Sequence, residues 1–255
     1  MFGIYTMAVV TLIASAVTWG GMVYLLSGRL KCYLWLLLPG VPFSLVVNAG
    51  IKTSLAILVG QIANILPHQG LRTPGWFVLF LFMLSPVLEE GMKVVPLLLP
   101  RAWRLLIKPA AALWVGIMLG VGFGLGEAAY IAYSVAQLPE YSRLPWYAFT
   151  GYAGERWITF FMHGVMTAVF VIGLQRTKLA ALAGYFGATG LHALVNAGPM
   201  LARVGIIPTW ATSVCVVGAF TLTAYIFERL RHQAARGAGI SEAAGEILYF
   251  ERRTK

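Results

Sequence analysis

The chain has 255 residues, of which 59% are hydrophobic and only 11% are charged, with a mean hydropathy of +0.79. These values are typical of a membrane protein with several spans and leave no room for a sizeable soluble domain. The formal charge of +10 could suggest nucleic acid, but its distribution fits membrane orientation better, so we expect no nucleic-acid partner.

Seven apolar stretches predict an all-α fold, a polytopic transmembrane helix bundle. The first is too long for a signal-peptide core and indicates a retained helix. The second is too long for one upright helix and contains Pro39 and Pro42. We therefore expect a short initial segment followed by a span, and a split into two crossings would make eight spans. The stretches are 2–26, 33–66, 76–99, 109–135, 157–174, 179–200 and 206–227.

Positive charges predict the orientation of the bundle. With the N-terminus outside and the C-terminus cytoplasmic, thirteen Lys and Arg residues lie inside and four lie outside, while Lys52 and Lys93 lie within the membrane. We expect one transmembrane domain at 1–228 and a basic cytoplasmic tail at 229–255, in a multi-pass protein of a prokaryotic cell membrane. Residues 241–252 fit either a short amphipathic helix on the inner surface or a disordered tail. The inside residues are Arg29, Lys31, Arg101, Arg104, Lys108, Arg176, Lys178, Arg229, Arg231, Arg236, Arg252, Arg253 and Lys255, and the outside residues are Arg72, Arg143, Arg156 and Arg203.

Several classes of intramembrane enzyme are excluded by what the sequence lacks. Aspartate is absent, whereas aspartyl intramembrane proteases need two aspartates. No GxSG and no HExxH motif occurs, which argues against rhomboid-type serine chemistry and site-2-type zinc chemistry. Cys32 and Cys215 form neither a disulfide framework nor a metal-ligand spacing.

The third apolar stretch contains SPVLEEGMK at residues 85–93, with Glu89, Glu90 and Lys93 near its middle. Each such charge costs roughly 2.5–3.5 kcal/mol at the centre of a membrane helix. Lys93 lies four residues after Glu89 and three after Glu90, so an ion pair on one helix face offsets part of this cost. A salt bridge that joins helices is one interpretation, and a functional site is the one we favour.

Further polar residues at helical spacing occur in the next three stretches, at depths between the middle of the membrane and its outer leaflet. Glycines at intervals of four precede the glutamate in the fourth stretch and predict close packing with a neighbouring helix. Together these residues predict one shared cavity that opens outward. They are Gly116, Gly120, Gly124 and Glu127 in the fourth stretch, Arg156, Thr159, His163 and Thr167 at the fifth, and Thr189, His192 and Asn196 in the sixth.

The order of these motifs resembles that of the PrsW family of glutamic-type intramembrane proteases, which are related to the CAAX prenyl endopeptidases and the Abi proteins. The resemblance covers residues 74–200 and consists of EExxK at residues 89–93, FxxxE at residues 123–127, His163, and HxxxN at residues 192–196. The segment ERWITFFMH also resembles the YhfC-like membrane proteases. The chain has FxxxE where CAAX endopeptidases have FxxxH, which argues against prenyl-protein substrates.

The resemblance implies peptide-bond hydrolysis by a glutamate-activated water without a cofactor, and the chemistry of two neighbouring carboxyls allows one to act as base and the other as acid. We expect Glu89 to act as the base and Glu127 as its acid/base partner, while Glu90 and Lys93 support them; the roles of Glu89 and Glu90 are exchangeable. His163 is expected to orient the water or to protonate the leaving amine. His192 and Asn196 are expected to stabilise the oxyanion. The implied partner is a membrane-anchored protein, such as an anti-sigma factor, cut at or just outside the outer membrane boundary.

Three other classes of function remain open on the sequence. A zinc enzyme would use His163, His192 and a glutamate such as Glu127 as ligands. A proton- or ion-coupled transporter also places Glu and His near the middle of the membrane, although the chain shows no internal repeat. A non-catalytic scaffold would keep the polar core only for assembly.

Overall fold

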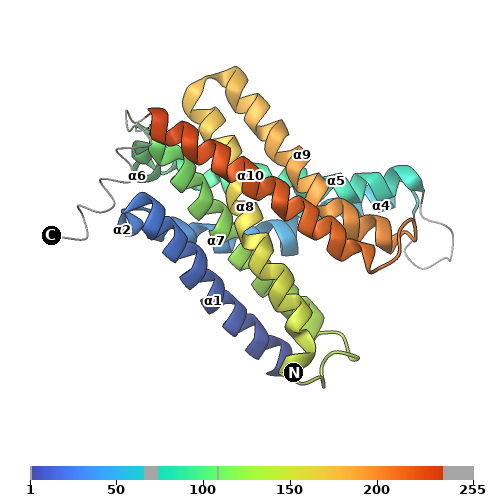
Figure 1. Ribbon diagram of the computed structural model, residues 1–255. Helices are drawn as coiled ribbons and strands as arrows, with labels where there is room; N and C mark the ends of the chain where they lie inside the picture. Colours follow the sequence, from blue (N-terminus) through green and yellow to red (C-terminus); the bar gives the residue numbers. More distant parts are fainter. Residues whose placement is uncertain (1, 66–73, 108, 238–255) are drawn as a thin grey trace.

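The computed structural model describes residues 2–65, 74–107 and 109–237, and these residues form helices with no strand, as Figure 1 shows. The expected all-α fold is therefore confirmed. The longer helices are α1 (Phe2–Ser27), α3 (Leu37–Leu45), α4 (Lys52–Ile62), α5 (Gly75–Lys93), α7 (Pro109–Ala136), α8 (Thr150–Arg176), α9 (Lys178–Arg203) and α10 (Ala211–Gly237). The shorter elements are α2 (Leu30–Tyr33), α6 (Pro100–Trp103), a π-helical turn at Val46–Ile51, and 3₁₀ turns at Leu34–Leu36, Val95–Leu98, Arg104–Ile107 and Trp146–Phe149.

Five helical segments among the described residues are long and apolar enough to cross a membrane: Gly3–Ser27, Lys31–Ile62, Ala110–Ala136, Trp146–Arg176 and Ala211–Arg236. They coincide with the expected first, second, fourth, fifth and seventh spans. Helix α9 coincides with the expected sixth span. Helix α5 begins where the third span was expected to begin but ends at Lys93 and not at 99, so the charged residues expected near the middle of this span lie at the C-terminal end of the helix. Neither helix is among the five. The chain is thus a multi-pass membrane protein.

Local sequence signals end the helices where the chain must turn. Gly28 follows α1 with φ 64° and Gly205 follows α9 with φ 77°, the left-handed conformation that glycine adopts at the end of a helix. Thr177 separates α8 from α9, and its side chain accepts a hydrogen bond from the backbone N–H of Ala180, which caps α9. Helices α8 and α9 are therefore joined by a tight turn.

The second apolar stretch differs from the expectation of a short segment and a separate span. Residues 31–62 run as one helical segment, in which Pro39 and Pro42 both lie within α3. This segment departs from regular α-helix before the prolines, at the 3₁₀ turn Leu34–Leu36, and after them, at the π turn Val46–Ile51. A π turn holds one more residue than an α-helical turn, so it changes the direction in which the following residues point.

Helix α7 lies in the centre of the bundle because its glycines allow close packing on two sides. A side chain at Gly120 would meet the backbone carbonyl of His163 in α8, and one at Gly122 would meet the backbone of Leu37 in α3. The same holds along both faces, for Gly116 against α8 and for Gly126 against α3. The packing expected for the glycines of the fourth stretch is confirmed, and it brings α3, α7 and α8 together around the polar residues.

The two ends of the bundle differ in their connections. In Figure 1 the N-terminus lies near the loop between α7 and α8, whereas α2, α6 and the C-terminal end of α10 gather at the opposite end. Helix α10 continues to Gly237, past the expected span end at 227, so Arg229, Arg231 and Arg236 belong to the helix. Arg72, Lys108 and residues 238–255, including the helix considered at 241–252, lie outside the described residues.

Candidate active site

Three carboxylates in the interior each form an ion pair with a different cation. Two of them, Glu89 and Glu90, are fully buried at the C-terminal end of α5, and the third, Glu127 in α7, has 15% of its side chain exposed. The pairs are Glu89 Oε1 with Lys52 Nζ at 2.8 Å, Glu90 Oε1 with Lys93 Nζ at 2.5 Å, and Glu127 Oε2 with an Arg156 terminal nitrogen at 3.1 Å. A buried charge is tolerated only when it is paired in this way.

One carboxylate oxygen of Glu89 accepts two hydrogen bonds, and the other accepts none within the described part of the chain. Its Oε1 accepts hydrogen bonds from Lys52 Nζ and from Ser85 Oγ, which lies one helical turn earlier in α5. Its Oε2 is buried and has no hydrogen-bond partner among the described residues. It lies 3.8 Å from His192 Nε2, which is too long for a direct hydrogen bond.

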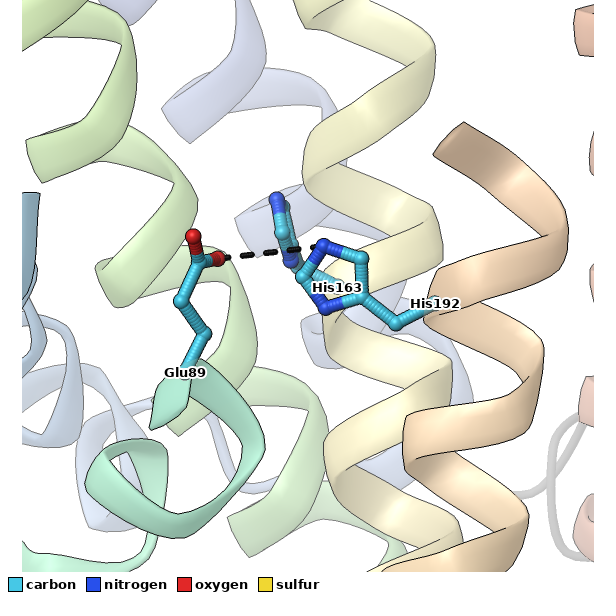
Figure 2. Close-up of side chains that lie close together, drawn as sticks. All are labelled: Glu89, His163 and His192. Carbon is cyan, nitrogen blue, oxygen red and sulfur yellow. Dashed lines mark ion pairs between the residues drawn. The ribbon is translucent and has the colours of Figure 1, made fainter. Parts of the chain in front are cut away.

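His192 extends from α9 toward the two glutamates of α5, as Figure 2 shows for Glu89. Its Nδ1 lies 2.7 Å from Glu90 Oε1. Because Lys93 donates to the same Glu90 oxygen, that carboxylate acts as an acceptor, and Nδ1 of His192 must carry the proton. In the neutral ring, Nε2 then has a lone pair directed toward Glu89.

His163 is held in α8 from both of its ring nitrogens. Lys93 Nζ lies 2.7 Å from Nδ1, and an ammonium group can only donate, so Nδ1 accepts. Nε2 therefore carries the proton and donates to Glu127 Oε2 at 3.0 Å. The close approach of α7 at Gly120 places the backbone of His163 directly against α7. The ring of His163 also packs near His192, with centroids 5.2 Å apart.

A small polar pocket, lined by residues of α7, α8, α9 and α10, reaches Glu127, His163 and His192 of this network, whereas Glu89 and Glu90 are not among its lining residues. Its volume is about 30 Å³, which exceeds the space that one water needs. Its polar lining is formed by Glu127, Glu155, Arg156, Thr159, His163, His192 and Asn196, and its apolar lining by Met162, Val195, Pro199 and Val216. Glu127, His163, His192 and Asn196, which the sequence placed in three separate stretches, thus share one pocket.

The arrangement differs from the sequence-based expectation in its ion pairs. Of the two glutamates that could pair with Lys93, the structure joins Lys93 to Glu90, while Glu89 pairs with Lys52 from a stretch without a recognised motif. Ser85 and the ion pair between Arg156 and Glu127 were not anticipated either. The sequence did contain a signal for Lys52, because a lysine inside an apolar span requires a partner.

Metal-ligating atoms also meet in this region. One donor atom from each of Glu89, His163 and His192 lies within 4.8 Å of the others, and all three residues are buried. The carboxylate in this group is Glu89, whereas the zinc alternative from the sequence used Glu127. Figure 2 shows these three side chains coming from three different helices.

A multi-pass helix bundle that buries carboxylates and histidines around a small pocket defines a membrane protein with a hydrolase-like centre inside the membrane. A model of the family described as "PrsW family intramembrane metalloprotease" matches residues 28–226, and the chain therefore belongs to this family. It is an intramembrane peptide hydrolase whose substrates lie in the lipid bilayer, which argues against the transporter and scaffold alternatives. Comparisons with curated proteins and with solved structures gave no match.

The family description names a metalloprotease, so the donor atoms were compared with the needs of a metal ion. A tetrahedral zinc needs three protein ligands with free lone pairs. In the group of Glu89, His163 and His192, only Glu89 Oε2 and His192 Nε2 are free of a hydrogen bond; Glu90 Oε2 also lacks a partner among the described residues, but Glu90 is not part of this group. Both nitrogens of His163 are occupied, one of them by the Lys93 ammonium, which would repel a dication. Each carboxylate already has a cationic partner. In this arrangement the residues do not fit a metal ion.

Proposed function

We propose that the protein hydrolyses a peptide bond of a membrane-anchored protein by means of a water activated by Glu89. One observation carries the proposal: a free carboxylate oxygen and a free imidazole nitrogen, Glu89 Oε2 and His192 Nε2, face each other at 3.8 Å in a buried site. A water between two such acceptors donates one hydrogen bond to each. Its oxygen lone pair is then directed away from both and toward a substrate carbonyl.

The proton balance uses Glu89 and Glu127. As the water oxygen bonds to the carbonyl carbon, Glu89 takes one proton and passes it to the amide nitrogen as the C–N bond breaks. Glu127 lines the pocket and takes the second proton of the former water, which completes the leaving ammonium. The products are a carboxylate and an ammonium group, and both glutamates return to their ionised form.

The other expected residues have supporting roles in this proposal. Asn196 lines the pocket and is the candidate donor to the oxyanion, while His192 orients the water through Nε2. Glu90 fixes the tautomer of His192, and Lys93 connects Glu90 with His163. His163 in turn holds Glu127 in the pocket. The oxyanion role expected for His192 is thus assigned to Asn196, because a neutral His192 has no proton on Nε2.

The proposed substrate approaches from the outer side of the membrane. Glu155 and Arg156 at the pocket lie near the start of α8, and α8 follows the connection that the charge distribution places outside. This orientation requires seven crossings, with α5 and α9 as spans and the N-terminus outside. It is supported by the basic connections at α2, α6 and the α8–α9 turn. A single-span regulatory protein, such as an anti-sigma factor, is the substrate class that the family resemblance suggests.

A metal-dependent mechanism is the second candidate, favoured by the proximity of Glu89, His163 and His192 donor atoms and by the family description. It would require His163 to leave Lys93 or Glu127. No step of the proposed mechanism uses an ion.

The test uses the purified protein in proteoliposomes with a panel of reporter proteins, each anchored by one apolar helix. Wild-type protein should cleave at least one reporter, and Glu89→Gln should reduce the rate by about 10²–10⁴-fold, the usual contribution of a general base. Glu140→Gln is the matched control, because Glu140 is exposed in the α7–α8 connection. Cleavage by Glu89→Gln at the wild-type rate would refute the proposal.

A further inference from the structure

Lys52 contacts the proposed base from a part of the chain to which no role is assigned. Its Nζ lies 2.8 Å from Glu89 Oε1 and 2.9 Å from Ser85 Oγ. The Lys52 side chain is 22% exposed, whereas Glu89 is fully buried. Lys52 therefore forms the boundary of the polar network on the side of α4, opposite to the pocket residues from α8 and α9.

The backbone before Lys52 is arranged so that this contact forms. Lys52 is the first residue after the π turn Val46–Ile51. One additional residue in a turn rotates all following residues by about 100° relative to a continuous α-helix. The turn is supported within the bundle by the buried Asn48, whose amide donates to the backbone carbonyl of Ser44. Without the π turn, position 52 would face another direction.

The contact determines which oxygen of Glu89 is available. Lys52 and Ser85 both donate to Oε1, so this oxygen is saturated, and Oε2 is left free opposite His192. Lys52 also supplies the positive charge that Glu89 needs beside two other carboxylates, because Lys93 pairs with Glu90 and Arg156 with Glu127. We propose that Lys52 is a positioning residue that selects Oε2 of Glu89 as the base, an inference that rests on the proposed function.

A purely structural ion pair between α4 and α5 would predict a different result. Loss of such a pair lowers the stability of the folded protein, but it leaves the turnover of the remaining folded molecules unchanged. A positioning residue acts on the transition state, so its loss lowers kcat while KM changes little. An arginine at position 52 keeps the charge and the donor groups, and it should restore most of the rate.

The experiment measures kcat and KM of Lys52→Met and Lys52→Arg in proteoliposomes, with the reporter that wild-type protein cleaves fastest. Lys178→Met is the matched control, since Lys178 lies exposed at the start of α9. We expect Lys52→Met to lower kcat about a hundredfold, with KM within about twofold, because small misplacements of a reacting group cost this much. The kcat of Lys52→Arg should stay within about tenfold of the wild-type value, and that of Lys178→Met within about twofold.

Two outcomes overturn the inference: wild-type kcat in Lys52→Met, or an equal loss in Lys52→Met and Lys52→Arg. If Lys52→Met does not accumulate as folded protein, Lys52→Gln takes its place, because glutamine removes the charge but keeps an N–H donor, and the same fall in kcat is expected. Glu89→Gln is measured in the same series. Full activity of Glu89→Gln would refute the proposed function itself, whereas an inactive Glu89→Gln beside a fully active Lys52→Met would refute only the role of Lys52.

Discussion

Nε2 of His192 and Oε2 of Glu89 face each other at 3.8 Å, and neither atom is used elsewhere in the network. The other nitrogen of His192 is held by Glu90, and the other oxygen of Glu89 is held by Lys52 and Ser85. Hydrogen bonds to the far atom of each side chain therefore hold the two residues in place, while the two atoms that face each other stay free. Acceptors fixed in this way can orient a water that enters between them.

The two adjacent glutamates should respond differently to the same substitution. Glu90 Oε1 is engaged by both Lys93 and His192, so Glu90→Gln should change the tautomer and position of His192 and leave the base in place. We expect Glu90→Gln to lower turnover by about 10–10²-fold and Glu89→Gln to lower it by about 10²–10⁴-fold. Rates of both variants with one reporter decide the assignment. A greater loss in Glu90→Gln than in Glu89→Gln would exchange their roles.

Lys93→Met should destabilise the fold as well as the site. Lys93 is fully buried and donates to Glu90 and His163, so its loss leaves a buried carboxylate without a cation. Removing one partner of a buried ion pair costs about 3–5 kcal/mol. Denaturant unfolding in detergent measures the loss, and the Lys93→Met, Glu90→Gln double variant should recover part of it. Unchanged stability of Lys93→Met would contradict the ion pair.

Gly120→Ala tests the close packing that positions His163. A Cβ at position 120 would overlap the backbone carbonyl of His163, so α8 must move away from α7. We expect a stability loss of about 1–3 kcal/mol and a fall in turnover, because His163 and Glu127 shift together. Gly218→Ala on α10 is the control, since nothing lies within 4 Å of the added atom. Equal behaviour of the two variants would argue against this packing role.

We predict that the protein acts without a metal ion, because both nitrogens of His163 are occupied and each carboxylate is paired with a cation. Treatment with a chelator such as 1,10-phenanthroline should leave turnover unchanged, and elemental analysis of the active protein should find no stoichiometric zinc. Loss of activity that is restored by one equivalent of zinc would establish the metal mechanism. In that case His163→Ala should also abolish zinc binding, a result that can be measured without a substrate.

The fold class and most of the site were accessible from the sequence because both depend on local spacing. Apolar length predicts the spans, and residues three or four apart lie on one helix face, so EExxK and HxxxN were recognisable without coordinates. Lys52 was recognised as buried, but its partner was not, because ion pairing between helices depends on how they pack. The π turn that directs Lys52 has no distinct sequence pattern, and the expected break at Pro39 and Pro42 was wrong.

The orientation of the bundle makes a final prediction about where the substrate is cut. In the proposed orientation the basic α8–α9 turn and α6 lie inside, so we expect the start of α8 and the pocket beside Glu155 and Arg156 to belong to the outer half. For a test by membrane-impermeant thiol labelling, Cys32 and Cys215 are first replaced by serine. A cysteine at position 143 should then react from outside, and one at position 104 should not. With the orientation established, mass spectrometry of the reporter fragments should locate the cleaved bond in the outer half of the substrate span or just outside it. A cut on the cytoplasmic side would mean that substrate reaches Glu89 by another route than this pocket.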